Sequence, residues 1–373
     1  MSRPDPTRIL VALLMPIGDM LFCQPSLIGL RHRFPHAQIT ALVVPAIVPL
    51  IDPNPVFDAV IPWTPDANKQ ETVNQELLAT WKAIHAQHFD LVISYSAAGN
   101  WLMRLTFIRH QIVQRLPLET LLFGIPPRRG YRERHAIEHY WNVIAPLGIY
   151  PQQTEDHFPQ WTISEAERDD ARRLLATAGV QRDSGRPLVM LHPGAMGFGK
   201  SKRWPVASFG ELAQELIATH DAQIVVIGGP EDVVLAETIV TMTGGRAISL
   251  AGQTKLRGSI ALIANADAYV GCDTGMTHYA VALDIPTVAL FGISSVQQFA
   301  PRARDPQRLS IVQPEPSQPP IGFFIGTESL YVRHHYERDT RMASITVARA
   351  LSAVRELLPI ATSAKTVPTH SFV

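Results

Sequence analysis

The sequence contains little cysteine, no excess of charge of either sign and no long apolar run. Its two cysteines, Cys23 and Cys272, exclude a disulfide scaffold and a cysteine-based zinc finger and are typical of a reducing compartment. The 33 Lys and Arg equal the 33 Asp and Glu, so the overall charge does not favour bulk nucleic-acid binding. Apolar stretches break within about ten residues, short of the ~20 that a transmembrane helix needs.

Motifs of several common enzyme classes are also absent. The chain has no His-Glu-x-x-His and no Cys-x-x-Cys, so no set of metal ligands is evident, and we expect no metal and no other cofactor. It has no Gly-x-Ser-x-Gly turn of a serine hydrolase, and its first strand is not followed by a Gly-x-Gly-x-x-Gly dinucleotide turn. The polar N-terminus lacks the layout of a signal peptide, which predicts a cytoplasmic protein.

Strand-like and helix-like segments alternate along the whole chain. In the first half, the apolar run 9–15 leads through the turn 16–19 into an apolar-periodic segment, and further strands are expected at 39–44 and 91–94. Such unbroken apolar runs are typical of parallel strands that are buried on both faces. In the second half, strands are expected at 188–191, 223–227, 247–250, 268–270 and 287–292, with helices between them.

This alternation predicts an α/β protein with two doubly wound, Rossmann-type domains. The 373 residues are enough for two domains, and we expect them to join near residues 150–185. Residues 301–335 are Pro-rich and predicted to be irregular, and 346–358 predicts a last helix. Ligands of open α/β sheets bind beyond the carboxyl ends of the strands, so we expect two such domains to place their sites around one cleft.

The segment from Gly271 to His278 is the first candidate site. It follows a predicted buried strand and opens a helix that Asp273 or Thr274 can cap. Gly275 permits close approach of a ligand, and the free N–H groups of the first turn suit a phosphate or diphosphate, to which His278 can add a hydrogen bond. The alternative is an ordinary capped helix with a solvated histidine.

The loop that begins at His192 is the second candidate. It contains Pro193 and Gly194 and ends in Lys200, Lys202 and Arg203, so it is Gly-rich and cationic and can hold a polyphosphate. The alternative is a cationic surface loop.

Two features of the first half suit catalysis and an anionic acceptor. Asp19 lies in the first strand-to-helix turn, where it can cap the helix or, opposite an anion site, act as a general base. Between residues 101 and 141, seven Arg stand against three Glu, which suits an anionic acceptor or a membrane surface. The alternative is a solvated face. Three of these arginines are the expected acceptor-binding residues: Arg128, Arg129 and Arg132.

Taken together, these motifs resemble glycosyltransferase family 9, the heptosyltransferases of lipopolysaccharide core assembly. The resemblance covers roughly residues 8–358 and rests on motifs in the right order and spacing. These motifs are Ile17-Gly18-Asp19, Leu191-His192-Pro193-Gly194-Ala195, Lys202-Arg203-Trp204-Pro205, Gly228-Gly229-Pro230-Glu231, Leu250-Ala251-Gly252, and Asp273-Thr274-Gly275 with His278.

The resemblance implies a GT-B fold, with two Rossmann-like domains that face a central cleft. It implies an acceptor domain over residues 1–160, a nucleotide-sugar domain over 161–345, a helix over 346–360 that packs back on the N-terminal domain, and a flexible tail over 361–373. The implied activity is a metal-independent, inverting transfer of a heptose or related sugar from an ADP-sugar to a lipopolysaccharide-core or other surface-glycan acceptor. We also expect a peripheral association with the cytoplasmic face of the inner membrane.

The resemblance also implies individual roles. Asp19 matches the general base that deprotonates the acceptor hydroxyl, Lys202 matches the cation on the diphosphate, and Glu231 matches a ribose contact. The other expected donor-binding residues are Pro193, Gly194, Asp273, Thr274, Gly275, Met276 and His278. Two alternatives are a GT-B enzyme that uses a different nucleotide-sugar, and a non-catalytic GT-B protein that binds a nucleotide-sugar or glycan.

Overall fold

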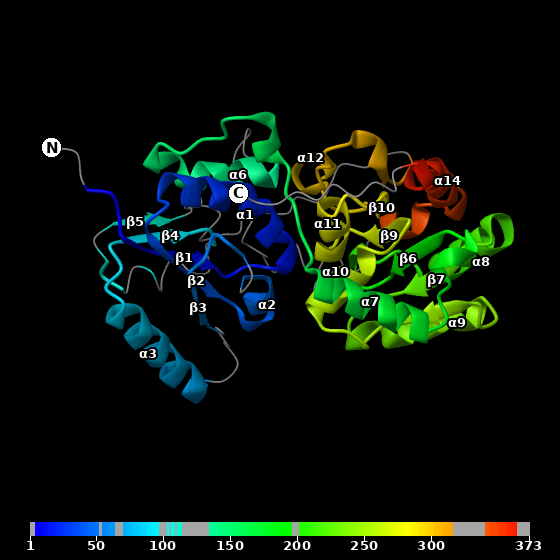
Figure 1. Ribbon diagram of the computed structural model, residues 1–373, viewed down its shortest axis with the longest axis horizontal. Coiled ribbons are helices and arrows are strands. Elements are labelled where there is room, and N and C mark those ends of the chain that lie inside the picture. Colours follow the sequence, from blue (N-terminus) through cyan, green and yellow to red (C-terminus); the bar gives the residue numbers. More distant parts are fainter. Residues whose placement is uncertain are drawn as a thin grey trace. The chain divides into compact units, whose positions relative to one another are not determined.

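The computed structural model describes residues 4–51, 54–63, 70–96, 103, 106–108, 110–113, 134–195, 201–315 and 340–363 (Figure 1). These residues fall into two compact units, one up to Pro159 and the other from Gln160 onward. Each unit is built on its own parallel sheet.

The N-terminal unit contains a five-stranded parallel sheet with the order β3-β2-β1-β4-β5. The chain moves outward from the central β1 to β2 and β3 and then returns to the other side for β4 and β5, which is the doubly wound arrangement. The interior strands are buried along almost their whole length, because helices cover the sheet. The strands are β1 (Arg8–Leu13), β2 (Gln38–Val43), β3 (Ala59–Pro62), β4 (Leu91–Ser94) and β5 (Gln111–Val113), and the helices are α1 (Ile17–Arg33), α2 (Val48–Ile51), α3 (Gln70–Ala86) and α6 (Ala136–Ile144).

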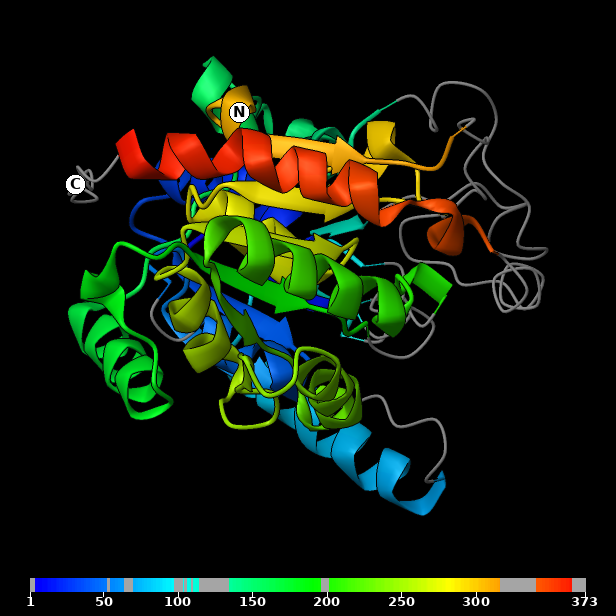
Figure 2. The same ribbon diagram turned by 90° about the vertical axis from the view of Figure 1, so that its right-hand side faces the viewer.

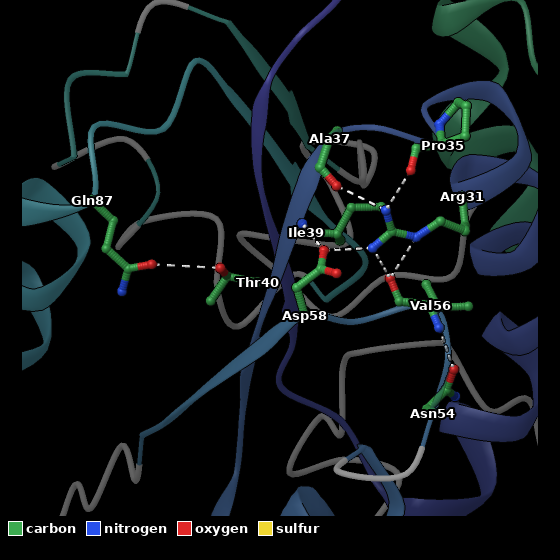
Figure 3. A network of polar contacts seen from close by, with 9 residues as sticks. All are labelled: Arg31, Pro35, Ala37, Ile39, Thr40, Asn54, Val56, Asp58 and Gln87. Atoms are coloured by element: carbon green, nitrogen blue, oxygen red, sulfur yellow. Dashed lines mark hydrogen bonds and ion pairs between the residues drawn. The ribbon is translucent and has the colours of Figure 1, made fainter.

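Arg31, near the end of α1, ties this helix to the beginnings of β2 and β3 (Figure 3). Its guanidinium donates to the carbonyl oxygens of Val56 at 2.7 Å and Ala37 at 2.8 Å, and it pairs with Asp58 at 2.6 Å. The Asp58 carboxylate also accepts the Ile39 backbone N–H at 2.7 Å. Because the strands begin here, this network lies at the N-terminal end of the strands. Ligands of such sheets bind at the opposite end, beyond the strand C-termini.

The C-terminal unit contains a six-stranded parallel sheet with the order β11-β10-β9-β6-β7-β8. Alternate strand residues, such as Val189, Leu191 and Val270, point into a large apolar core shared with α8, α9 and α14. The strands are β6 (Leu188–His192), β7 (Gln223–Val226), β8 (Ala247–Ser249), β9 (Ala268–Cys272), β10 (Thr287–Leu290) and β11 (Leu309–Val312), and the helices are α7 (Glu165–Thr177), α8 (Val206–His220), α9 (Val233–Met242), α10 (Leu256–Ile263), α11 (Gly275–Ala282), α12 (Val296–Phe299) and α14 (Val347–Ser363).

The last helix, α14, covers most of the range 346–360, where we expect a helix that packs back on the N-terminal domain. Within its own unit it lies beside α8 over the C-terminal sheet (Figure 2). Its apolar residues Ala350, Val354 and Leu357 are buried in the core of that unit. The helix also runs to Ser363, so it includes the first residues of the expected tail.

Several elements differ from the expectations. The stretch 301–335, expected to be irregular, contains β11, and no element was expected for β3, β5, α2, α6 or α12. The strands β3, β5 and β11 have only three or four residues each, too short for a clear periodicity, and they form at the edges of sheets that already exist. Among the described residues, no helix is both long and apolar enough to cross a membrane.

Candidate active site

The order of the C-terminal strands predicts where this unit binds a ligand. From β6 the chain runs through β7 and β8 to one edge of the sheet, and from β9 through β10 and β11 to the other. The two directions meet between β6 and β9, which are direct neighbours with His192 opposite Gly271. Ligands of doubly wound sheets bind at such a switch point, beyond the strand C-termini.

Both predicted phosphate-binding segments begin at this switch point. Pro193 and Gly194 follow β6 directly and are buried, and Asp273, Thr274 and Gly275 follow β9. The sheet therefore brings together two segments that are about 80 residues apart in the sequence. Of the other expected donor residues, Met276 is buried in the first turn of α11, and Glu231 is exposed at the end of the loop after β7.

Neither Asp273 nor Thr274 caps α11 through its side chain. Thr274 occupies the N-cap position with extended backbone but makes no capping hydrogen bond. Its hydroxyl lies 3.4 Å from Nδ1 of His192 at the end of β6. The N–H groups of the first helical turn are therefore not satisfied by a side-chain cap, which is the arrangement of a helical anion site.

Asp273 is the centre of a buried charge cluster. Its Oδ2 lies 2.6 Å from Nζ of Lys202, and its Oδ1 lies 3.6 Å from Nε2 of His278. Although burial disfavours a charged carboxylate, the Lys202 ammonium and the His278 imidazole hold the pKa of Asp273 well below its usual range. Asp273 therefore stays ionised and holds Lys202 next to the N-terminus of α11.

Trp204 fixes the segment that carries Lys202. Trp204 is 1% exposed, and its indole Nε1 donates to the Ile345 carbonyl oxygen at 2.9 Å. The backbone N–H of Trp204 donates to Sγ of Cys272 at 3.2 Å. This anchor ties the Lys202 segment directly to the end of β9. The Lys202-Arg203-Trp204-Pro205 motif therefore joins a buried aromatic anchor to cations at the strand ends.

The sequence from Gly194 to Ser201 also matches the spacing of a Walker A loop, Gly-x-x-x-x-Gly-Lys-Ser. In a Walker A loop, the helix begins at the Lys-Ser pair. Here Arg203, Trp204 and Pro205 intervene, and α8 begins only at Val206. The structural context therefore does not support a Walker A loop. Residues 196–200, which include the expected cation Lys200, lie outside the described residues.

Asp232 is a site residue that the sequence analysis missed. Its carboxylate accepts from Nη2 of Arg203 at 3.2 Å and from the Gly229 backbone N–H at 3.1 Å, and only 3% of its side chain is exposed. A Cβ added at Gly194 would lie 2.1 Å from Oδ2 of Asp232. A Cβ added at Gly228 would lie 2.7 Å from Cβ of Asp232. Asp232 therefore binds Arg203 and packs the loops after β6 and β7 against each other.

His192 is buried beside these cations. Burial and the charge of Arg203, opposed by Glu231, lower the pKa of His192 to about 4. The imidazole is therefore neutral at physiological pH, so it contributes a hydrogen-bonding group rather than a charge. The sequence analysis placed His192 at the start of the second candidate loop but gave it no individual role.

Asp19 lies at the corresponding switch point of the N-terminal sheet, between β1 and β4. The N-cap of α1 is Pro16, so Asp19 is not the capping residue but stands in the first helical turn. Its Oδ1 accepts a hydrogen bond from the Tyr140 hydroxyl at 3.1 Å. A half-buried carboxylate at the carboxyl edge of the sheet is suitable for proton transfer.

The expected acceptor-binding arginines, Arg128, Arg129 and Arg132, lie outside the described residues. Within the described ranges, no group of three or more His, Cys, Asp or Glu is arranged to hold a metal ion.

Comparison with known families identifies the chain. The model of glycosyltransferase family 9 (heptosyltransferase) matches residues 77–319, which is more than half of the sequence. The chain belongs to glycosyltransferase family 9. The family and the enzyme class expected from the sequence motifs are therefore confirmed.

Two related proteins show how the family 9 chain compares along its length. Lipopolysaccharide heptosyltransferase 2 of Salmonella typhimurium is 28% identical over 307 residues, which are 75% of this chain and 81% of that protein. Lipopolysaccharide heptosyltransferase 3 of Escherichia coli is 25% identical over 365 residues, or 92% of this chain and 95% of that protein. The family 9 chain is thus a heptosyltransferase-like glycosyltransferase related to enzymes of the lipopolysaccharide core.

The solved structure of the Escherichia coli ADP-heptose lps heptosyltransferase II has a TM-score of 0.69 with this chain at 23% identity. The match covers 95% of this chain and 99% of that protein. The expected fold class, GT-B with two Rossmann-like domains, is therefore confirmed.

Proposed function

We propose that this family 9 protein transfers a heptose or related sugar from an ADP-sugar to a lipopolysaccharide-core or other surface-glycan acceptor, with inversion and without a metal ion. The observation that carries the proposal is the cluster of Lys202, Asp273 and His278 at the N-terminus of α11. Support for ADP-heptose as donor comes from the name of the structurally similar Escherichia coli enzyme.

The donor diphosphate is proposed to bind over the N-terminus of α11. The N–H groups of Gly275 and Met276 and the Lys202 ammonium are suitable donors to its oxygens. In the reaction, the bond between the anomeric carbon and the diphosphate breaks, and negative charge develops on the leaving oxygen. A fixed cation and a helix N-terminus stabilise that charge, which is the task that a metal ion performs in other transferases.

Asp19 is proposed to be the general base. Its carboxylate accepts the proton of the acceptor hydroxyl as the hydroxyl oxygen attacks the anomeric carbon from the face opposite the diphosphate. One base and one stabilised leaving group are sufficient for a single displacement with inversion. Arg128, Arg129 and Arg132 are proposed to bind an anionic acceptor, and a glycolipid acceptor would place the enzyme at the cytoplasmic face of the inner membrane.

The assignment of Asp19 is tested by Asp19→Ala. We expect transfer to fall by 10²-fold or more, roughly the contribution of a general base, while ADP affinity measured by calorimetry stays within about twofold of the wild type. Normal turnover by this variant would contradict the assignment. Activity after dialysis against EDTA should equal that of the untreated enzyme, and a loss restored by a divalent cation would contradict the metal-free mechanism.

The identity of the donor is tested by a thermal-shift screen of ADP, UDP, GDP and CDP. A nucleotide present at 100 times its Kd stabilises the folded state by about 2.7 kcal/mol, which is readily measured. We expect ADP to give the largest shift. A larger shift with another nucleotide would replace ADP-heptose by another donor.

A further inference from the structure

Helix α6 lies close against α1, the helix that carries Asp19. The two helices pack along much of their length, and Gly29 of α1 makes this approach possible. A Cβ at Gly29 would lie 2.7 Å from the Trp141 ring, so any larger residue would push α6 away. Trp141 Nε1 donates in turn to the Asp156 carbonyl oxygen at 3.1 Å, which fixes the outer side of α6.

The first turn of α6 is fixed as well. His135 is the N-cap, and its Nδ1 accepts the Ile137 backbone N–H at 3.3 Å. The same imidazole packs edge-on against Phe22 of α1, with ring centroids 5.4 Å apart. Helix α6 is thus held to α1 near both of its ends, and Tyr140 lies between these two contacts.

Tyr140 contacts Asp19 from this fixed position. The side chain is 1% exposed, and its hydroxyl donates to Oδ1 of Asp19 at 3.1 Å. Its ring packs on that of Tyr95, which follows β4, with centroids 6.0 Å apart. A buried phenol in a fixed rotamer gives its hydrogen bond a defined direction, so it orients the carboxylate plane of Asp19.

Two buried polar groups beside this pair, Cys23 and Tyr95, are neutral. Cys23 follows Asp19 by one helical turn, and burial and the Asp19 charge raise the pKa of its thiol well above the usual range, although a hydrogen bond with Tyr140 opposes this. The Ser26 hydroxyl donates to the Tyr95 hydroxyl oxygen at 3.1 Å. Burial likewise raises the pKa of Tyr95, although Ser26 opposes this, so both groups stay protonated at working pH.

We propose that Tyr140 is a positioning residue for the general base: its hydroxyl holds the Asp19 carboxylate in the orientation that accepts the acceptor proton. This inference rests on the proposed function of Asp19. A neutral donor orients the carboxylate without neutralising it, whereas a cation in the same place would lower its basicity much further. The orientation is then set by the fold rather than by the acceptor.

The test is Tyr140→Phe, with Tyr95→Phe as the matched control. Both variants delete one buried phenol hydroxyl, but only the first removes a hydrogen bond to Asp19. For Tyr140→Phe we expect kcat to fall about tenfold, the lower end for a hydrogen bond to a charged group, with an unchanged KM for the donor. We also expect the acidic limb of its kcat/KM profile to move to higher pH, because the charged carboxylate loses a donor. Tyr95→Phe should leave kcat and the position of the acidic limb at their wild-type values.

The outcomes separate this inference from the proposed function. If Asp19→Asn retains turnover, the general-base assignment fails whatever Tyr140 does. If Asp19→Asn is inactive but Tyr140→Phe keeps kcat within twofold and an unmoved acidic limb, only the role of Tyr140 is overturned. Equal losses in Tyr140→Phe and Tyr95→Phe, accompanied by equal drops in melting temperature, would also overturn it, since they indicate packing alone.

Discussion

The switch point of each sheet carries a carboxylate, but the surroundings of the two carboxylates differ. In the C-terminal unit, Asp273 is paired with the cation Lys202, and Asp232, after β7, is paired with Arg203. In the N-terminal unit, Asp19 accepts a hydrogen bond from the neutral hydroxyl of Tyr140. The difference matches the two proposed tasks. A carboxylate that only holds a cation in place benefits from a full opposite charge, whereas a carboxylate that must accept a proton has to remain basic.

This contrast predicts that variants in the two units change different measured properties. Changes around Asp273 and Asp232 should alter nucleotide affinity or stability, and changes around Asp19 should alter turnover. Four predictions follow this division, from the largest expected effect to the smallest.

Lys202→Ala should lower ADP affinity about 100-fold, because it removes a charge-assisted contact to the diphosphate and leaves Asp273 buried without its ammonium partner. Isothermal calorimetry measures this directly. The double variant Lys202→Ala/Asp273→Asn separates the two causes, since it removes the unpaired charge as well. An unchanged Kd for Lys202→Ala would remove this residue from the donor site.

Asp232→Asn should lower the midpoint of thermal unfolding, since breaking a buried ion pair costs about 3 kcal/mol. Its neighbour Glu231 offers a matched control, because it carries the same charge but is exposed. Glu231→Gln should leave the midpoint within about 1 °C of the wild type, as expected for a surface change of under ~0.5 kcal/mol. Equal midpoints for the two variants would contradict the structural role of Asp232.

Gly29→Ala and Gly194→Ala should damage different functions, although both insert one methyl group into a packed contact. The first presses on Trp141 and displaces α6, so we expect kcat to fall with unchanged ADP affinity; the second presses on Asp232, so ADP affinity should fall. Each overpacking should cost about 1–3 kcal/mol of stability. If both variants changed only ADP affinity, the proposed separation of the two sides would be wrong.

His192 should make the protein less stable in mild acid. The pKa of His192 is about 4 in the folded state and near 6.5 in the unfolded state. Its stabilising contribution to the free energy of unfolding is therefore complete above pH 6.5 and is lost as the pH falls towards 4. His192→Asn should therefore flatten the fall of the melting temperature between pH 6.5 and 4. An unchanged slope in this variant would contradict the role of His192.

Much of this fold and site could be predicted from local sequence. The strands β1, β6 and β9 could be predicted from their unbroken apolar runs, because burial on both faces requires apolar residues at every position. The segments Pro193-Gly194 and Asp273-Thr274-Gly275 were found because each follows such a run directly. The position of a segment after a strand places it at the carboxyl edge of a parallel sheet, wherever its partner lies in the chain.

Three features depended on contacts between distant residues. Asp232 and Glu231 are adjacent acidic residues, and only the packing of Gly194 and Gly228 decides that Asp232 is the buried one. Tyr140 lies 121 residues from Asp19 in the sequence, on a helix that was not expected. The amphipathic pattern of α14 predicts that one face is buried but carries no information about which sheet buries it.

The sequence by itself determined the alternation of strands and helices, the two-domain organisation and the types of chemical group available at the strand ends. These follow from periodicity and short motifs, which act within one turn or one strand. The tertiary structure decided which groups meet: Lys202 with Asp273, Arg203 with Asp232, and Tyr140 with Asp19. The physical reason is that the interaction energy of each pair depends on a distance of about 3 Å, and only packing of the complete units sets distances between residues so far apart in the chain.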